Sequence, residues 1–302
     1  TEVAHFPHCV PLAGAVEYVS NKNETSTVAL LQGYVPNQGD GWSYTLNYLE
    51  RALETPTAQG VDAKSAHGAY LTLMHTLATR TGELHKAFAT RSGDPAFEPE
   101  PLTAQDVEAW KAKVREEANA TLAMLEKIAG EKARIMAFID ACAAPKGPAL
   151  RTRHHGDYHL GQVLIANNDF VIIDFEGEPS RPLAEARRKH SPLRDVAGML
   201  RSFSYAKWSA RERYVSGLTG GQAAVAADKD GSLDAWEAEA RRSFLAAYAQ
   251  VTGISLDDMG GLLRLFEMEK VLYELRYEIN NRPNWVQVPV SGLLGLLGGA
   301  QQ

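Results

Sequence analysis

Cysteine is scarce in this chain of 302 residues, which has only Cys9 and Cys142. Neither residue belongs to a CxxC pair or to a Cys/His cluster, so neither a disulfide framework nor a structural zinc site is expected. Cysteine usage of this kind is typical of a reducing compartment, and we expect a cytoplasmic protein.

Targeting and membrane signals are also lacking. No basic segment followed by an apolar one opens the chain, and the longest apolar run, Leu293 to Gly299, is too short to cross a bilayer. The net charge of -6 argues against binding to nucleic acid or to anionic membranes. With 45% hydrophobic and 23% charged residues, the composition is that of a globular protein with a real core.

The order of patterns along the chain predicts an α+β fold. Two strands, Ala13 to Val19 and Thr27 to Val35, precede a hinge-like cluster of breaker residues from Pro36 to Gly41. Apolar spacing then predicts helices at Trp42–Glu54, Ala63–Phe88, Ala104–Ile128, a segment ending near Ala143, Val196–Tyr205, Leu233–Val251 and Leu256–Asn281. Thr103 and Asp106 form a capping-box pattern, and Ala223 to Asp234 is interpreted as a loop.

The stretch from His154 to Asp174 carries the most informative chemistry. Asp157 and Asp174 stand at the two ends of a predicted hairpin, with Gln162 between them. Magnesium-dependent phosphoryl transfer needs one carboxylate to orient the attacking hydroxyl, and an amide and a second carboxylate to hold the metal. The alternative is that each aspartate only caps a turn. The residue types, order and spacing favour the catalytic interpretation.

Several motifs give this stretch a family resemblance. HGDYHLGQ from His155, DFEGEP from Asp174 and SPLRDVAGMLRSFSYA from Ser191 resemble bacterial maltokinase, within the aminoglycoside-phosphotransferase-like group of kinases. LAGAVEY near the start and EKVLYELRYEINNRPNW near the end extend the resemblance over nearly the whole chain. The segment DPAFEPEPLT is similar to the kinase part of proteins in which maltokinase is fused behind a trehalose synthase.

The resemblance implies a protein-kinase-like fold. Residues 1–36 would be the remaining part of an N-terminal lobe and its hinge, and residues 37–302 a mainly helical C-terminal lobe. It also implies ATP and Mg²⁺ as cofactors and maltose as the substrate, phosphorylated to maltose 1-phosphate, with trehalose synthase as a fused or associated partner.

Residue roles follow from the same resemblance. Asp157 would be the catalytic base, and Gln162 and Asp174 would be the magnesium ligands. The hinge that holds adenine would consist of Leu31, Gln32, Gly33 and Tyr34. His155 and Asp195 would support the catalytic loop, and His159 would contact the substrate. Two features stay open. Glu176 either pairs with a basic neighbour such as Arg181 or lies near the metal. The run Arg187-Arg188-Lys189 is either a solvated loop or an activation-segment-like loop near the nucleotide.

The helix predicted at Leu256–Asn281 offers a sugar site. Leu265, Met268, Leu272, Leu275 and Ile279 fall on one core-facing side. A neighbouring side and the residues after it carry Lys270, Tyr273, Glu274, Tyr277, Arg282 and Trp285. Aromatic rings stack on the apolar faces of sugars while charged groups bind the hydroxyls. The alternative is that the two tyrosines only line the margin of the core.

Two elements of a working kinase are missing from the residues before Asp40. They contain no glycine-rich loop, and their only lysine, Lys22, lies in a polar turn. The chain starts at Thr1, not Met, so we expect a piece of a longer polypeptide that is inactive when isolated. Two alternatives stay open: a kinase for another small sugar or an aminoglycoside-like acceptor, and a non-catalytic sugar-binding or docking module of trehalose synthase.

Overall fold

The computed structural model describes residues 3–23, 25–54, 63–178, 185, 187–216 and 223–298. Its helices are α1 (Gly41–Glu54), α2 (Ala63–Ala66), α3 (Gly68–Phe88), α4 (Ala104–Met124), α5 (Lys132–Ala141), α7 (Leu193–Ser216), α8 (Ala223–Thr252), α9 (Leu256–Asn281) and α10 (Gln287–Gly298). Short 3-10 helices are η1 (Glu126–Glu131), η2 (Leu160–Gln162) and η3 (Pro283–Trp285). The strands form three antiparallel pairs: β1 (Leu12–Val19) with β2 (Thr25–Gln32), β3 (Glu100–Pro101) with β4 (Leu150–Arg151), and β5 (Val163–Ala166) with β6 (Asp169–Ile172).

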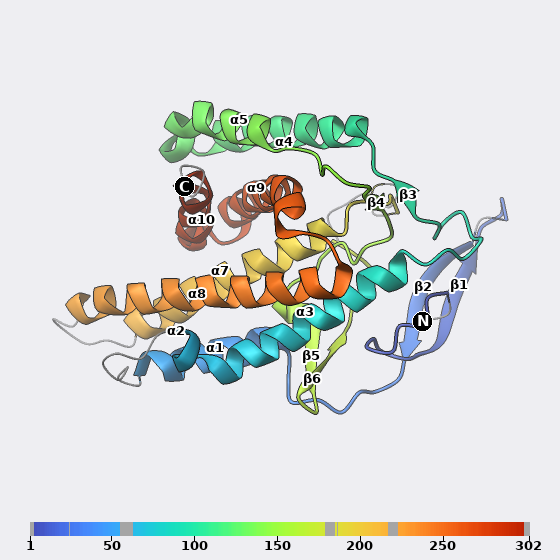
Figure 1. Cartoon of the computed structure of the whole chain (residues 1–302), viewed down its shortest axis with the longest axis horizontal. Coiled ribbons are helices and arrows are strands. Elements are labelled where there is room, and N and C mark those ends of the chain that lie inside the picture. Colours follow the sequence, from blue (N-terminus) through green and yellow to red (C-terminus); the bar gives the residue numbers. More distant parts are fainter. Residues whose placement is uncertain are drawn as a thin grey trace.

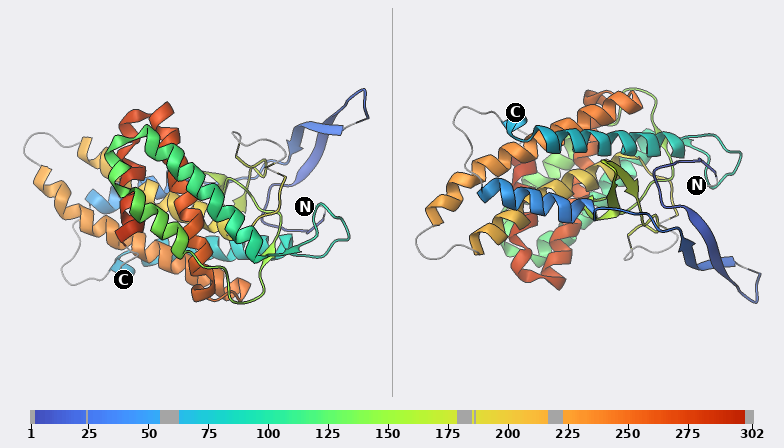
Figure 2. Two further views of the ribbon diagram at one scale, coloured as in Figure 1. Left: turned by 90° about the horizontal axis from the view of Figure 1, so that it is seen from above. Right: turned by 90° about the horizontal axis from the view of Figure 1, so that it is seen from below.

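Most helices pack into one body, and α7 runs through its middle (Figure 1). α3 lies along α8, and α7 contacts α1, α8 and α9. α4 and α5 form a further layer against α9 (Figures 1 and 2). Val196, Leu200 and Phe203 of α7 have no exposed surface, as expected for a helix enclosed on several sides. Within the described part of the chain, no helix combines the length and apolarity needed to span a membrane.

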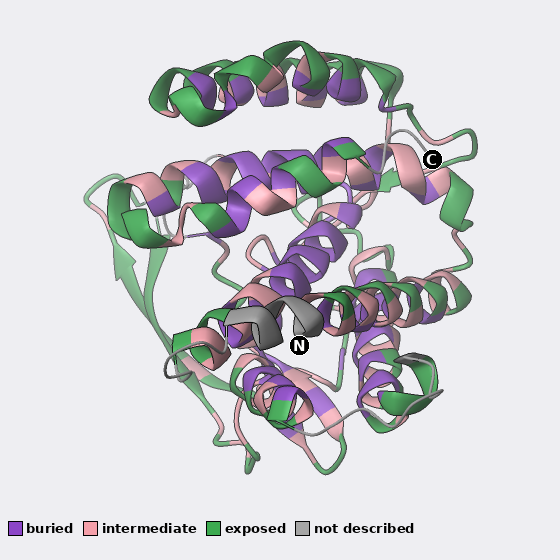
Figure 3. Cartoon of the chain, turned by 90° about the vertical axis from the view of Figure 1, so that its left-hand side faces the viewer, coloured by how far each residue is buried: buried purple, intermediate pink, exposed green. Residues whose placement is uncertain are grey.

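The β1–β2 ribbon projects away from this body (Figures 1 and 2). Its strands pair only with each other among the described residues, and nearly all of the ribbon is exposed (Figure 3). Apolar side chains are exposed with the rest, including Val16 at 59% and Leu31 at 66%. A hairpin that leaves such side chains in water contributes little packing to the body.

Extended backbone borders the β5–β6 hairpin on both sides. The Gln38 amide donates to the Ile165 carbonyl at 2.8 Å, and the Ile165 amide donates to Gly39 at 2.9 Å. On the other edge, the Ile172 amide donates to the His8 carbonyl at 2.8 Å. The hairpin is therefore fixed in a small sheet whose outer members come from the beginning of the chain.

The element predictions are mostly confirmed, with two corrections. Ala223 to Asp234 is not a loop, because α8 begins at Ala223, and α7 extends well beyond the predicted Val196–Tyr205. Both corrections concern where a helix begins or ends, which apolar spacing in the sequence defines poorly. The capping box is confirmed: Asp106 donates its amide to the Thr103 hydroxyl at 3.2 Å and accepts from the Thr103 amide at 2.9 Å. The assignment of residues 1–36 and 37–302 to two lobes stays a prediction.

Candidate active site

The β5–β6 hairpin brings Gln162 and Asp174 together. Asn167 and Asn168 adopt left-handed backbone angles (φ 53° and 60°), as a tight two-residue hairpin turn requires, and asparagine tolerates these angles best after glycine. At the open end of the hairpin, the Gln162 side-chain amide donates to an Asp174 carboxylate oxygen at 2.8 Å. Asp174 itself has a positive φ of 61°, a strained conformation often found at functional sites.

This pair fits the oxygen donors that magnesium prefers. An amide and a carboxylate offer two hard oxygen ligands, and phosphate oxygens and water commonly complete the coordination of this ion. Among the described residues, no group of three or more His, Cys, Asp and Glu is arranged to hold a metal ion. A magnesium ion here would therefore depend on oxygen atoms of the nucleotide.

Asp195 holds the backbone of the loop that carries Asp157. Its carboxylate accepts from the amides of His155 at 2.7 Å and Gly156 at 2.9 Å, and His85 Nε2 lies 3.2 Å away. Burial disfavours the charged form of Asp195, but the His85 hydrogen bond and the nearby histidine rings prevail and lower its pKa. His155 Nε2 donates to the Ile173 carbonyl at 2.8 Å, which ties the loop to the strand before Asp174. His155 and Asp195 thus hold the backbone of the loop with Asp157, and their role in supporting a catalytic loop stays a prediction.

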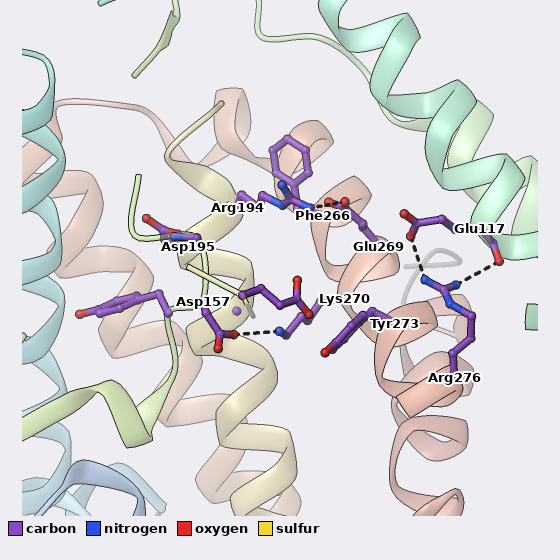
Figure 4. A pocket seen from close by; sticks show the side chains of 13 residues that line it. Glu117, Asp157, Arg194, Asp195, Phe266, Glu269, Lys270, Tyr273 and Arg276 are labelled. Carbon is purple, nitrogen blue, oxygen red and sulfur yellow. Dashed lines mark hydrogen bonds and ion pairs between the residues drawn. The ribbon is translucent and has the colours of Figure 1, made fainter. Parts of the chain in front are cut away.

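Asp157 stands at the mouth of a pocket (Figure 4). Lys270 Nζ lies 3.4 Å from one carboxylate oxygen of Asp157 and 4.8 Å from the centre of the Tyr273 ring. His159 Nε2 lies 3.8 Å from the other oxygen. Burial lowers the pKa of His159, while the charge of Asp157 acts in the opposite direction. Lys270 and His159 therefore flank the two oxygens of the Asp157 carboxylate.

The pocket contains more carboxylates than cations. Its volume is about 50 Å³ as the side chains stand. The acidic residues that line it are Glu117, Asp157, Glu178, Asp195 and Glu269, and the basic ones are Arg194, Lys270 and Arg276. Arg276 lies 3.4 Å from Glu117, and Arg194 pairs with Glu269 (Figure 4). Burial and the charge of Glu269 raise the pKa of Glu117, although Arg276 partly opposes this shift.

The predicted sugar-binding residues of α9 divide into three groups. Lys270 and Tyr273 line the pocket. Glu274 does not, because its carboxylate is 7% exposed and accepts from Arg201 of α7 at 2.7 Å inside the core. We therefore remove it from the proposed acceptor contacts, since α9 is rotated so that this position faces α7. Of the predicted core face of α9, Leu265, Met268, Leu272 and Leu275 are fully buried, whereas Ile279 is only partly buried.

The third group consists of Tyr277, near the end of α9, and of Arg282 and Trp285, which follow the helix. The guanidinium of Arg282 lies 5.5 Å from the ring centre of Tyr277 and 5.2 Å from that of Trp285. Because an α-helix rises 1.5 Å per residue, Arg282 lies roughly 18 Å from Lys270 along the axis of α9. These three residues line no part of the pocket at Asp157.

Sequence reasoning missed five charged residues of the pocket: Glu117, Glu178, Arg194, Glu269 and Arg276. Glu269, Tyr273 and Arg276 follow one another at helical spacing, so a helical projection centred on Tyr273 would have found two of the five. Glu117 comes from α4, and nothing local to α4 indicates that it meets α9.

Of the four residues predicted to hold adenine, Leu31 and Tyr34 do not line the neighbouring cavity, whereas Gln32 does. Gln32 lines a cavity of about 540 Å³ together with Leu30, Asp174 and Phe175. Leu31 and Tyr34 do not line it and are 66% and 86% exposed, and the Gly33 amide donates to the Pro11 carbonyl at 2.8 Å.

Of the two features left open by the sequence, the structure describes the Arg187-Arg188-Lys189 run but not the suggested partner of Glu176. Lys189 is not a free solvated charge, because it donates to the Pro95 carbonyl at 2.7 Å and pairs with Glu100 at 2.8 Å. Lys189 therefore fastens this segment to Pro95 and to β3, whereas Arg187 and Arg188 are exposed. Arg181, the suggested partner of Glu176, lies outside the described residues.

The β5–β6 hairpin, the loop with Asp157 and the helical body together define a protein-kinase-like α+β fold, as predicted. No family model matches the chain. Among solved structures, a glucosamine kinase in complex with glucosamine, ADP and inorganic phosphate superposes with a TM-score of 0.77 at 25% identity, over 99% of this chain and 70% of that one. A second glucosamine kinase structure, crystal form B, gives 0.74 at 26% identity, over 98% and 66%.

Curated relatives carry the same name. The glucosamine kinase of Streptacidiphilus jiangxiensis is 29% identical over 284 residues, which is 89% of this chain and 58% of the relative. That of Mycolicibacterium smegmatis is 29% identical over 298 residues, which is 94% of this chain and 66% of the relative. The chain therefore resembles sugar kinases over most of its length and spans about three fifths of the relatives' length.

Proposed function

We propose that this chain supplies the acceptor site and half of the metal site of an ATP-dependent kinase for an amino sugar, with glucosamine as the first candidate. The observation that carries this proposal is the excess of carboxylates in the pocket beside Asp157. An ammonium group on the acceptor would offset that excess of acidic residues, whereas a neutral sugar would not. The relatives named glucosamine kinases support the same choice.

Each part of the site then has a role in the transfer. Asp157 accepts the proton of the attacking hydroxyl, a contribution of roughly 10²–10⁴-fold in typical general-base catalysis. Lys270, 3.4 Å away, holds the carboxylate in place, and Tyr273 offers a ring face to the sugar. Gln162 and Asp174 hold magnesium, which neutralises charge on the nucleotide phosphates when bound.

The nucleotide would occupy the cavity that Gln32 and Asp174 share. The 302 residues contain neither a glycine-rich loop nor a strand lysine in the order a kinase requires, so we propose that the isolated chain binds the acceptor without turning it over. Acceptor binding therefore gives the first test, because it does not depend on the missing elements.

Calorimetric titration of the 302-residue chain with glucosamine and with glucose provides that test. The two sugars differ at one position, amine against hydroxyl, so their affinity ratio isolates the ammonium group. We expect glucosamine to bind about tenfold or more tightly, and Glu117→Gln to reduce that ratio. The matched variant Glu116→Gln, on the neighbouring position of α4 and absent from the pocket lining, should leave it unchanged. Equal binding of the two sugars would contradict the proposal.

Maltose is the second candidate acceptor, as the motif resemblance implies. The structural feature that favours it is the cluster of Tyr277, Arg282 and Trp285, which offers aromatic faces beyond the pocket for a second sugar ring. If maltose is the acceptor, Trp285→Ala should weaken maltose binding but not glucosamine binding. Association with a trehalose synthase rests on the motif resemblance alone.

A further inference from the structure

A second cavity lies between the end of α3, the segment that leads to β4 and the loop that joins α8 to α9. Its volume is about 410 Å³, and it shares no lining residue with the pocket at Asp157. Its wall combines apolar side chains with polar ones. The larger apolar ones are Pro145, Pro148, Leu150, Pro192, Leu193, Ile254 and Leu262, and the charged ones are Lys86 and Asp258. The size falls within the roughly 300–1,000 Å³ of typical small-molecule sites.

Two buried residues that line this cavity connect it to the catalytic loop. His85 is 4% exposed and Tyr248 is completely buried. The Tyr248 hydroxyl lies 2.8 Å from His85 Nδ1, and His85 Nε2 lies 3.2 Å from the Asp195 carboxylate. A carboxylate only accepts, so His85 Nε2 is the donor, and in the neutral ring Nδ1 then accepts from the Tyr248 hydroxyl.

The chain of contacts continues to the residue before the proposed base. Asp195 accepts the amides of His155 and Gly156 at 2.7 and 2.9 Å, and Gly156 directly precedes Asp157. All of these bonds are buried or partly buried, where hydrogen bonds are stronger and a displaced partner is costly. His85 and Tyr248 are therefore connected by hydrogen bonds to the backbone that positions Asp157.

We propose that this cavity binds a small, mainly apolar molecule of one or two rings, and that its occupancy is transmitted to the catalytic loop through Tyr248, His85 and Asp195. Pro145, Pro148 and Pro192 lack a backbone N–H and, with the leucine and isoleucine side chains, give an apolar ring a surface to pack on, while Lys86 and Asp258 leave room for one polar group on that ring. A ligand changes the loop only insofar as it binds one arrangement of this shell better than another. The binding site stands without the proposed function, whereas an effect on catalysis rests on it.

Indole is a suitable probe, because it is flat, two-ringed and mainly apolar. We would titrate it into the isotope-labelled 302-residue chain and follow backbone amide resonances by NMR. We expect saturable shifts at Leu193 and Ile254 in the cavity wall, and at His155 and Gly156 in the catalytic loop. This readout needs no ATP turnover, so a chain that phosphorylates no sugar still tests the proposal.

Two variants separate binding from transmission. Gly147 lines the cavity, and a Cβ added there meets no atom within 4 Å, so Gly147→Phe should fold and weaken indole binding by about tenfold. Tyr248→Phe keeps the ring but removes the hydroxyl that contacts His85. It should change indole affinity by less than about threefold while reducing the shifts at His155 and Gly156. Thermal melts of both variants confirm that they are folded.

Two outcomes would overturn the proposal. Shifts that do not saturate, or that Gly147→Phe leaves unchanged, would remove the binding site. Saturable shifts of the wall resonances without any shift of the His155 and Gly156 amide resonances would exclude the transmission. Shifts of these loop resonances that persist in Tyr248→Phe would exclude it as well.

Discussion

Asp195→Asn tests how the catalytic loop is held. Asparagine keeps one acceptor oxygen but places an NH₂ group where the second oxygen accepted a backbone amide, so a donor faces a donor. The loss of one charge-assisted hydrogen bond costs about 1.5–3 kcal/mol, and the stranded buried amide adds about 1–3 kcal/mol. Both amides lie within 2.9 Å of a carboxylate with almost no exposed surface. We therefore expect the free energy of unfolding to fall by roughly 3–5 kcal/mol, measured by urea denaturation.

Asp140→Asn is the matched control. Asp140 also accepts two N–H groups, both from Arg115, but its side chain is 59% exposed. An exposed ion pair contributes about 0–1 kcal/mol, so this variant should unfold almost as the parent does. A loss below about 1 kcal/mol for Asp195→Asn would refute the view that Asp195 supports the loop.

The pH dependence of the same pair of proteins provides a second check. The pKa of Asp195 is lowered in the folded protein, so its contribution to stability is present above the unfolded value of about 3.9 and is lost as pH falls through the folded value. The stability difference between the parent and Asp195→Asn should therefore be constant from neutral pH to about pH 5 and shrink only in strong acid. A difference that disappears near neutral pH would contradict this linkage.

Three further predictions concern the pocket and its packing. Because the pKa of Glu117 is raised and an ammonium group favours its ionised form, glucosamine affinity should fall as pH falls through that pKa; calorimetry across pH should show this loss for the parent and not for Glu117→Gln. Asp157→Asn should reduce phosphoryl transfer by roughly 10²–10⁴-fold in the complete enzyme, assayed by ADP release at saturating glucosamine; full turnover would exclude Asp157 as the base. Gly198→Ala places a Cβ 2.5 Å from the Tyr158 carbonyl, so urea unfolding should report a loss of about 1–3 kcal/mol, whereas Gly295→Ala, which meets no atom within 4 Å, should not be destabilised.

The choice between an amino sugar and a neutral sugar illustrates what the two kinds of information contribute. The face of α9 read from the sequence carries charges of both signs, and the acceptor implied by the motif resemblance was the neutral sugar maltose. In the folded chain, Glu274 turns inward to Arg201, while Glu117 arrives from α4 and Glu178 from the segment after β6. The resulting pocket is more acidic than α9 alone suggested, and this change directs the proposal toward glucosamine.

The amino-acid sequence by itself determined the hairpin with Asp157, Gln162 and Asp174, and the buried stripe of α9. These features depend on residues within a few positions of one another, where turn chemistry and helical periodicity act. Only the tertiary structure decided that Lys270 would lie beside Asp157, 113 positions earlier, and that His85 and Tyr248 would connect to Asp195. Such contacts depend on how each helix is rotated and which helices meet, and packing of the whole core sets both.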